Sequence, residues 1–119
     1  MAEENDLSIF ERIIAGDIPS EKIHEDELAI VIQDINPQAP THVLLIPKLK
    51  IPRLVDADVS HQALLGHLLL LAGKVARQLG CADAFRLVIN NGADAGQTVF
   101  HLHLHILAGG RFSEGGLVN

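Results

Sequence analysis

The chain has 119 residues, of which 48% are hydrophobic, and a formal net charge of −6, which fits a folded chain with a core of its own and excludes a disordered one. Only 3% of the residues are aromatic, so few rings can stack on unpaired bases, and the acidic balance disfavours coating a polyanion; both argue against nucleic-acid binding. The single cysteine, Cys81, excludes an internal disulfide, and the longest apolar run is too short to span a bilayer, so we expect a cytoplasmic protein without a membrane partner.

The first half of the chain predicts one short helix and three strands. Ser8 and Glu11 form a capping box that opens the helix, and Gly16 ends it. Two β-prone runs on either side of an acidic turn predict a hairpin. After a break that contains two prolines, a run that is apolar on both faces predicts a central strand. The three predicted strands are residues 22–25, 28–34 and 41–47.

The second half predicts one long helix and two more strands. The helix runs from Asp58 to about Leu79, and Gly80 ends it; its broad apolar face suits packing on a sheet, with His61 and His67 as partly exposed surface residues. A strand over residues 85–90, a glycine-containing turn and a last strand over residues 101–107 complete the chain.

These elements predict an α+β fold of about five mostly antiparallel strands, with the long helix on one face and a short N-terminal helix. No repeat or linker divides the chain, so we expect a single domain over residues 1–119, with residues 1–6 and 112–119 flexible or peripheral. Strand edges of so small a sheet need cover, which favours a homodimer.

The last strand carries three histidines, His101, His103 and His105, that alternate with apolar residues. A period of two predicts that all three imidazoles leave one face of the strand. A neutral imidazole is a competent nucleophile toward phosphorus, and residues 96–98 would supply a glycine, free N–H groups and a hydroxyl for phosphate oxygens, with the Asn90 amide nearby. A metal site and a merely solvated polar face are the alternatives. The metal site is disfavoured because rings on a flat strand diverge and no further ligand motif accompanies them.

The run from His101 to Leu107 resembles the histidine triad of the histidine triad (HIT) superfamily. Three further segments are similar in order and spacing to its Hint branch, the histidine triad nucleotide-binding proteins. With the Ile9-Phe10 pair and the Gly109-Gly110-Arg111 end, the resemblance covers roughly residues 7–111. The three segments are residues 34–42, 45–48 and 90–98.

The resemblance implies a homodimeric nucleotide hydrolase that cleaves purine nucleoside phosphoramidates, AMP or GMP conjugates, without a cofactor or a metal. It implies that His103 attacks the α-phosphorus to form a nucleotidyl-histidine, that His105 contacts the phosphate and leaving group, and that Asp34 accepts the ribose hydroxyls. His101 and His42 would complete the network around the nucleophile. The implied phosphate ligands are Asn90, Thr98 and the backbone of Val99, and Gly96 and Gln97 of the same loop are expected to bind substrate as well. The implied base contacts are Ile9, Phe10, Ile13, Ile32, Ile35 and Leu44.

Each residue also has a structural interpretation. Asp34 can cap the turn before Pro37, His42 can be a satisfied core histidine, Asn90 can close its turn, and the Ile and Phe positions are expected in the core. Thr98 stands where the family often has serine, and the tail lacks the tryptophan that shapes leaving-group choice in some Hint proteins. A regulatory nucleotide-binding dimer with incidental turnover and a dinucleoside polyphosphate hydrolase are the alternative functions.

Overall fold

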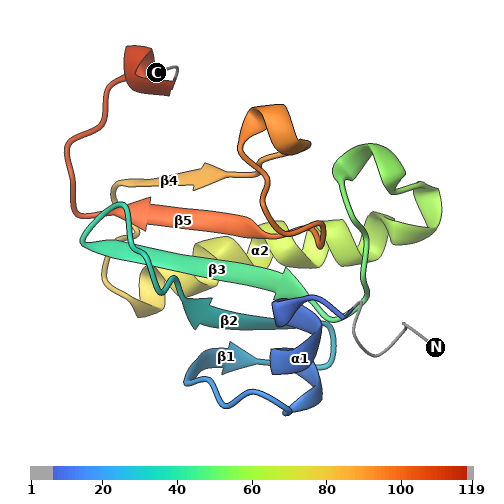
Figure 1. Ribbon diagram of the computed structural model, residues 1–119. Helices are drawn as coiled ribbons and strands as arrows, with labels where there is room; N and C mark the ends of the chain where they lie inside the picture. The colour runs from blue at the N-terminus through green and yellow to red at the C-terminus, as the bar shows by residue number, and fades with distance from the viewer. Residues whose placement is uncertain (1–6, 118–119) are drawn as a thin grey trace.

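The computed structural model describes residues 7–117 and is built on a five-stranded antiparallel sheet in the order β1-β2-β3-β5-β4 (Figure 1). The predictions for residues 1–6 and for the end of the tail, 118–119, lie outside the described residues. The α+β fold is confirmed. The strands are β1 Lys22–Glu25, β2 Ala29–Gln33, β3 Thr41–Pro47, β4 Phe85–Val88 and β5 Leu104–Ala108, and the two α-helices are α1 Ile9–Ala15 and α2 Gln62–Gln78.

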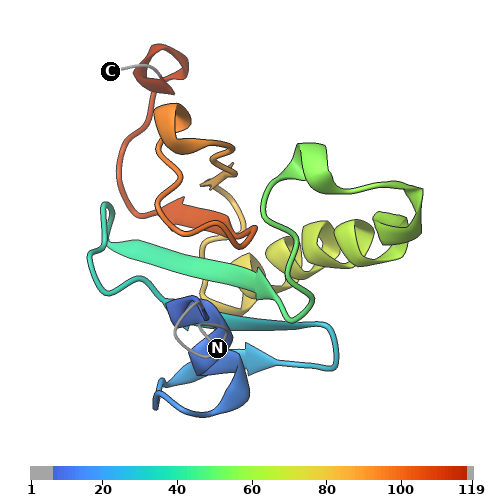
Figure 2. The ribbon, with the colours of Figure 1, turned by 45° about the vertical axis from the view of Figure 1, so that its right-hand side comes forward.

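The two helices cover opposite faces of the sheet (Figures 1 and 2). Successive side chains of a strand point to opposite faces, so β2 and β3 each feed both layers. Val31 and Val43 pack in one cluster with α2, whereas Ile32 and Leu44 pack in a second cluster with Phe10 of α1. The strand β3 lies between β2 and β5 and is buried from His42 to Pro47, as its double-sided apolar pattern predicted.

Local signals of the sequence determine where the helices begin and end. Ser8 Oγ accepts from the Glu11 N–H at 3.1 Å, and Glu11 Oε1 accepts from the Ser8 N–H at 2.9 Å, so the predicted capping box is formed. Asp58 caps a short 3-10 turn, Val59–His61, and the α-helix proper begins only after it. Among the described residues, no helix is long and apolar enough to cross a membrane.

β4 and β5 are shorter than predicted at the two ends that flank the loop between them. β4 ends at Val88 rather than at residue 90, and β5 begins at Leu104 rather than at residue 101. The reason is that the Leu102 N–H donates to the Ile51 carbonyl at 2.7 Å, outside the sheet. The alternation nevertheless persists, because Leu102 and Leu104 are buried in the cluster under α2 while His103 contacts Phe10 on the other face.

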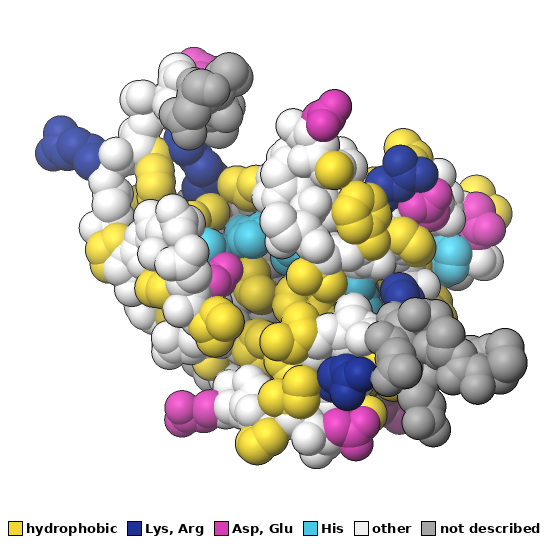
Figure 3. Space-filling view, in the orientation of Figure 1, with side chains coloured by type: hydrophobic (Ala, Val, Ile, Leu, Met, Phe, Trp, Pro, Cys, Tyr) yellow, Lys and Arg dark blue, Asp and Glu magenta, His cyan; other side chains and the backbone are white. Residues whose placement is uncertain are grey.

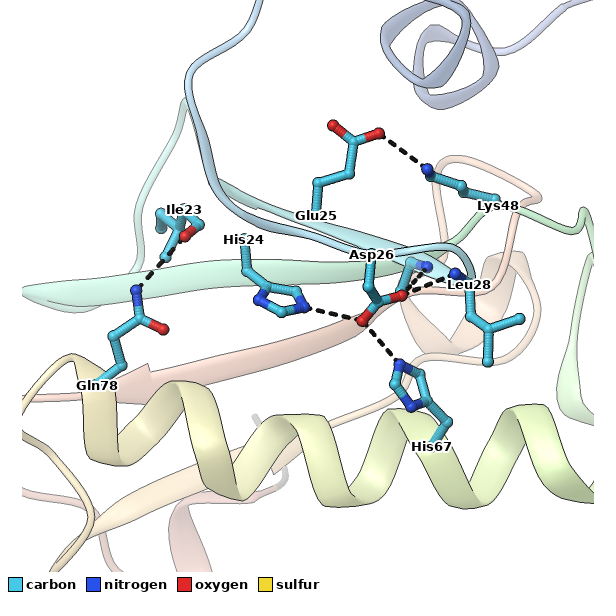
Figure 4. A network of polar contacts seen from close by, with 9 residues as sticks. Ile23, His24, Glu25, Asp26, Leu28, Lys48, His67 and Gln78 are labelled. Carbon is cyan, nitrogen blue, oxygen red and sulfur yellow. Dashed lines mark hydrogen bonds and ion pairs between the residues drawn. The ribbon is translucent and has the colours of Figure 1, made fainter.

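The hairpin of β1 and β2 is tied to α2 through one carboxylate. Asp26 Oδ2 lies 2.8 Å from His24 Nε2 and 2.9 Å from His67 Nε2, and Figure 4 shows the carboxylate between these two rings. Asp26 Oδ1 accepts the N–H groups of Leu28 and Ala29. His67 is partly exposed as predicted, but it is also a structural contact between the turn and the helix.

Candidate functional site

A pocket of about 250 Å³ lies on the face of the sheet that carries α1. Figure 3 shows histidine side chains beside a band of hydrophobic side chains in a hollow of this face. Its walls combine aliphatic residues at one end with ionisable and hydroxyl groups at the other. The lining residues are Ile9, Phe10, Ile13, Ile32, Gln33, Asp34, Ile35, Leu44, Thr98, Val99, His103 and His105.

All six residues implied as base contacts line this pocket. Two of them are not core residues, which corrects the expectation that these positions are buried in any case. Ile35 is 95% exposed and Ile9 is 45% exposed, so both form a rim that solvent reaches. Gln33 also lines the pocket, and no motif had indicated it; its place at the end of β2, between Ile32 and Asp34, is its only signal.

The strand register brings distant residues together here. Leu44 pairs with Ile32 of β2 on one side and with His105 of β5 on the other, so three pocket residues lie in a row across three strands. Beyond the end of β2, the Asp34 N–H donates to the carbonyl of His42 at 3.0 Å. The register therefore explains how Asp34, His42 and His105 meet.

His103 presents one nitrogen to the pocket in a fixed protonation state. Its Nδ1 lies 2.7 Å from the carbonyl oxygen of His101, and because a carbonyl only accepts, Nδ1 carries the proton. Nε2 is then the unprotonated nitrogen, and within residues 7–117 no group bonds it. Burial lowers the pKa of His103, against the opposing effects of its bond to His101 and of the charge on Asp34, so the ring is neutral at pH 7.

His42 and His105 form a second pair. His42 Nε2 lies 2.9 Å from His105 Nδ1, and the Gln38 N–H donates to His42 Nδ1 at 2.9 Å. Burial, with the neighbouring His103 and His42, lowers the pKa of His105 to about 4. His105 is therefore neutral at pH 7, and its remaining nitrogen, Nε2, is buried without a hydrogen bond.

Asp34 caps its turn, as one interpretation of the sequence expected, and it also lines the pocket. Its Oδ1 accepts the Asn36 N–H at 2.8 Å, which caps the turn before Pro37. Its Oδ2 lies 3.3 Å from His42 Nε2, and the side chain also lines the pocket. A carboxylate that lines the pocket retains free lone pairs for hydroxyl donors.

The loop before the histidines is organised differently from the prediction. The N–H groups of Gly96 and Gln97 are not free, because they close the turn onto the carbonyls of Ala93 and Gly92. The Gln97 side chain is buried and bonds Gly92, Pro52 and Val99, so it braces the loop and does not line the pocket.

Two backbone donors of this loop remain available, and the Asn90 amide does not reach the pocket. Thr98 and Val99 line the pocket, and among the described residues their N–H groups find no acceptor. Asn90 lies outside the lining. A Cβ at Gly96, whose φ is +99°, would be 3.6 Å from Asn90 Nδ2, so the amide packs directly against this glycine.

His101 is a buried support of the site and does not line the pocket. It is 0% exposed, and its Nε2 donates to the Pro47 carbonyl at 2.7 Å. Burial lowers its pKa, against the opposing bond to Pro47. Its own carbonyl orients His103, and the rings of His101 and His103 both make T-shaped contacts with Phe10.

Asp34, His42 and His105 are the one group among the described residues with ligand atoms within 4.8 Å of one another. Two nitrogens bound to one zinc ion at ~2.0–2.1 Å with tetrahedral angles lie about 3.3 Å apart. The His42 and His105 nitrogens are closer, at 2.9 Å, with a hydrogen bond between them. His42 Nε2 also holds the proton, because Nδ1 accepts from Gln38. As they stand, these residues do not fit a metal ion.

Comparison with known proteins gives consistent matches. The HIT domain model matches residues 15–112. An uncharacterized HIT-like protein of Synechocystis is 58% identical over 95% of this chain and 96% of its own length. The purine nucleoside phosphoramidase of Escherichia coli is 44% identical over 92% of this chain and 90% of its own. The crystal structure of a HIT family hydrolase from Legionella pneumophila superposes with a TM-score of 0.89 at 37% identity, covering 92% of this chain and 99% of that one.

Proposed function

This chain belongs to the HIT domain family, and on that premise we propose that it hydrolyses purine nucleoside phosphoramidates through a covalent nucleotidyl-histidine. The observation that carries the proposal is His103, whose Nε2 is unprotonated, unbonded and set at the polar end of an apolar pocket. A relative named for phosphoramidase activity, similar over most of both chains, supports this choice of substrate.

The chemistry needs two displacements at phosphorus. In the first, the lone pair of His103 Nε2 forms a bond to the α-phosphorus, and the P–N bond to the amine breaks, its electrons leaving with the amine nitrogen, which takes a proton from solvent. In the second, water attacks the phosphorus, the P–His103 bond breaks, and one proton of that water returns to solvent. The products are a nucleoside monophosphate and an amine, and His103 is regenerated with its Nδ1–H still donating to the His101 carbonyl.

The pocket offers a partner for each part of such a substrate. A purine has apolar faces, which suit the aliphatic walls and the Phe10 ring. Asp34 would accept the ribose hydroxyls, and the Thr98 and Val99 N–H groups would bond the phosphate oxygens. Asn90, Gly96 and Gln97 would not contact the substrate and would act by shaping the loop that carries Thr98 and Val99.

The direct test compares wild type with His103→Ala on an adenosine phosphoramidate. Wild type should release AMP, and the substitution should lower kcat by at least three orders of magnitude, as is usual for a lost nucleophile. Mass spectrometry of quenched wild type should show one nucleotidyl group on the His103 peptide. Equal AMP release by both proteins would overturn the nucleophile assignment.

Each alternative function makes a different prediction. A regulatory module with incidental turnover predicts that His103→Ala complements a deletion strain as well as wild type does, whereas a hydrolase predicts no complementation. A dinucleoside polyphosphate hydrolase predicts faster turnover of diadenosine polyphosphates than of phosphoramidates. A metal-dependent site predicts loss of activity in chelator, which we do not expect.

We further propose that the chain forms a single-domain homodimer through β4 and α2. β4 is an edge strand, so one side of its backbone can pair with a second copy. Beside it, exposed Leu54 and Leu69 line a wholly apolar groove. Leu69→Lys should shift the sedimentation coefficient to that of a monomer, whereas Leu70→Lys, one residue along and outside the groove, should not. A dimer that persists in Leu69→Lys would contradict this interface.

A further inference from the structure

We infer that the backbone N–H of Gln38 sets the tautomer of His42 and, through it, that of His105, which makes Gln38 a positioning residue for the site. The inference rests on the proposed hydrolase function for its catalytic meaning. The assignment of the two tautomers rests on hydrogen-bond geometry alone.

The argument follows from which groups can donate. A backbone N–H only donates, so His42 Nδ1, at 2.9 Å from the Gln38 nitrogen, must be the unprotonated nitrogen. His42 Nε2 then carries the proton and donates to His105 Nδ1, also at 2.9 Å. His105 Nδ1 is thereby an acceptor, so the proton of this neutral ring is on Nε2. One backbone group determines the protonation of two side chains.

Asp34 strengthens the same arrangement. Its Oδ2, 3.3 Å from His42 Nε2, favours a proton on that nitrogen. A second proton on His42 would have to go to Nδ1, where it would face the Gln38 N–H. A proton on His105 Nδ1 would face His42 Nε2–H in the same way. The same hydrogen bonds therefore fix which nitrogen of each ring carries the proton.

The chain around Gln38 is constrained, which keeps its N–H in position. Pro37 precedes it and Pro40 follows two residues later, and each fixes its own φ. The Gln38 side chain donates to the Asn36 carbonyl at 3.0 Å, and the Asn36 N–H is held by Asp34. The proline-containing break after β2 thus has a chemical consequence besides ending a strand.

The consequence is a neutral donor beside the nucleophile. The rings of His103 and His105 are 5.0 Å apart between centroids, and both line the pocket. With its proton on Nε2, His105 can bond a phosphate oxygen or the departing atom. The other tautomer would present a lone pair there and repel the same oxygen. Because His105 Nδ1 already accepts from His42, His105 cannot replace a proton lost from Nε2 by one at Nδ1, so it supplies a hydrogen bond and not a transferred proton.

The first test observes wild type directly by nitrogen-15 NMR. We expect scalar couplings across two hydrogen bonds, from the Gln38 amide nitrogen to His42 Nδ1 and from His42 Nε2 to His105 Nδ1. The one-bond proton couplings should place the protons of both rings on Nε2. A proton on Nδ1 of either ring overturns the inference, whether or not the protein hydrolyses a phosphoramidate.

The second test removes the N–H. Gln38→Pro deletes it, whereas the matched control Gln38→Ala keeps it and deletes only the side chain. We expect Gln38→Ala to keep the wild-type tautomers and Gln38→Pro to lose them, with kcat on adenosine phosphoramidate lowered ~10- to 100-fold and KM nearly unchanged. Unaltered tautomers in folded Gln38→Pro contradict the inference. If Gln38→Pro does not fold, an ester in place of the Gln38 amide in semisynthetic protein removes the same hydrogen.

A catalytic outcome separates the two proposals. If wild type shows the expected tautomers and does not turn over phosphoramidates, the proposed function fails and the assignment of Gln38 as the group that sets the tautomers stands. If wild type turns over the substrate and its tautomers differ from those expected, the proposed function stands and the assignment of Gln38 fails.

Discussion

The ring of Phe10 meets the imidazole of His103 edge to face, with centroids 4.9 Å apart and planes at 77°. The contact links the N-terminal helix to the proposed nucleophile. Phe10 is 6% exposed and meets His101 as well. An ion pair between Lys50 and Glu11, at 3.2 Å, holds the same helix to the loop after β3. Helix α1 is therefore a wall of the site.

Phe10→Leu should weaken nucleotide binding more than it weakens the fold. Leucine keeps most of the buried volume but loses the ring contacts, which are worth ~0.5–1.5 kcal/mol beyond burial, so KM should rise up to about tenfold. Ile14→Ala is the control, because Ile14 packs on the same cluster without lining the pocket. Steady-state kinetics and urea unfolding of both variants check this. A KM equal to wild type in Phe10→Leu would contradict a binding role.

The acid limb of kcat/KM should have its midpoint below about 6.5, the ordinary pKa of histidine. Burial lowers the pKa of His103, so Nε2 stays unprotonated and nucleophilic at more acidic pH. Initial rates between pH 4.5 and 8 measure the midpoint. A midpoint at or above 6.5 would argue against a buried nucleophile.

The free energy of unfolding should also fall as pH drops below about 6.5. His101, His103 and His105 all have lowered pKa values in the folded state, so the unfolded chain binds more protons in this range and is favoured by acid. Urea titrations at pH 7.5 and pH 5.5 give the difference. An unfolding free energy that is the same at both pH values would contradict it.

Asp26→Asn should destabilise the protein by about 1–3 kcal/mol, the usual effect of losing hydrogen bonds to a charged group. Burial alone would raise the pKa of Asp26, but bonds from His24, Leu28, His67 and Ala29 outweigh it and hold the pKa well below its usual range. The carboxylate therefore stabilises the fold above about pH 4, and this contribution is lost as pH falls further. Asp83→Asn, at an exposed position, should change stability by less than about 0.5 kcal/mol. Equal unfolding curves for the two variants at pH 7 would exclude the role of Asp26.

Gly109→Ala should destabilise the protein by roughly 1–3 kcal/mol and lower activity as well. Its φ is +89°, and a Cβ there would lie 2.9 Å from Cβ of Pro40, in the segment that carries Gln38. At Gly110 a Cβ would meet only the Phe112 ring, at 3.7 Å, so Gly110→Ala is the matched control. Thermal unfolding and kcat of both variants check this. Similar effects at both positions would mean that Pro40 does not matter.

Patterns within a short stretch predicted most of the fold. The capping box of Ser8, the double-sided apolar run of β3 and the alternation around His103 were all confirmed, because each depends on residues close in sequence. The ends of β4 and β5 were wrong, because they depend on a bond from Leu102 to a loop 51 residues earlier in the chain.

For the site, too, local patterns predicted one part and contacts between distant residues determine the other. Alternation placed the histidines on one face, and the local turn signal predicted the cap by Asp34, but nothing local indicates that Gln97 turns inward to brace its loop or that Asp34 also faces His42. The contact of Asp34 with His42 arises only when β2 pairs with β3, and the bond from Gln97 to Pro52 spans 45 positions of the chain. The tautomers likewise depend on which carbonyl or N–H each ring meets, which a sequence pattern does not specify.

The contact between His42 and His105 spans 63 positions of the chain. Closing so long a loop carries an entropic penalty that local hairpins avoid, so such contacts form late in folding. The aliphatic wall comes mainly from α1, β2 and β3, within the first 47 residues, whereas the reactive nitrogen belongs to His103, directly before β5 and near the end of the chain. We therefore expect a chain still emerging from the ribosome to be chemically inert until its last strand has docked.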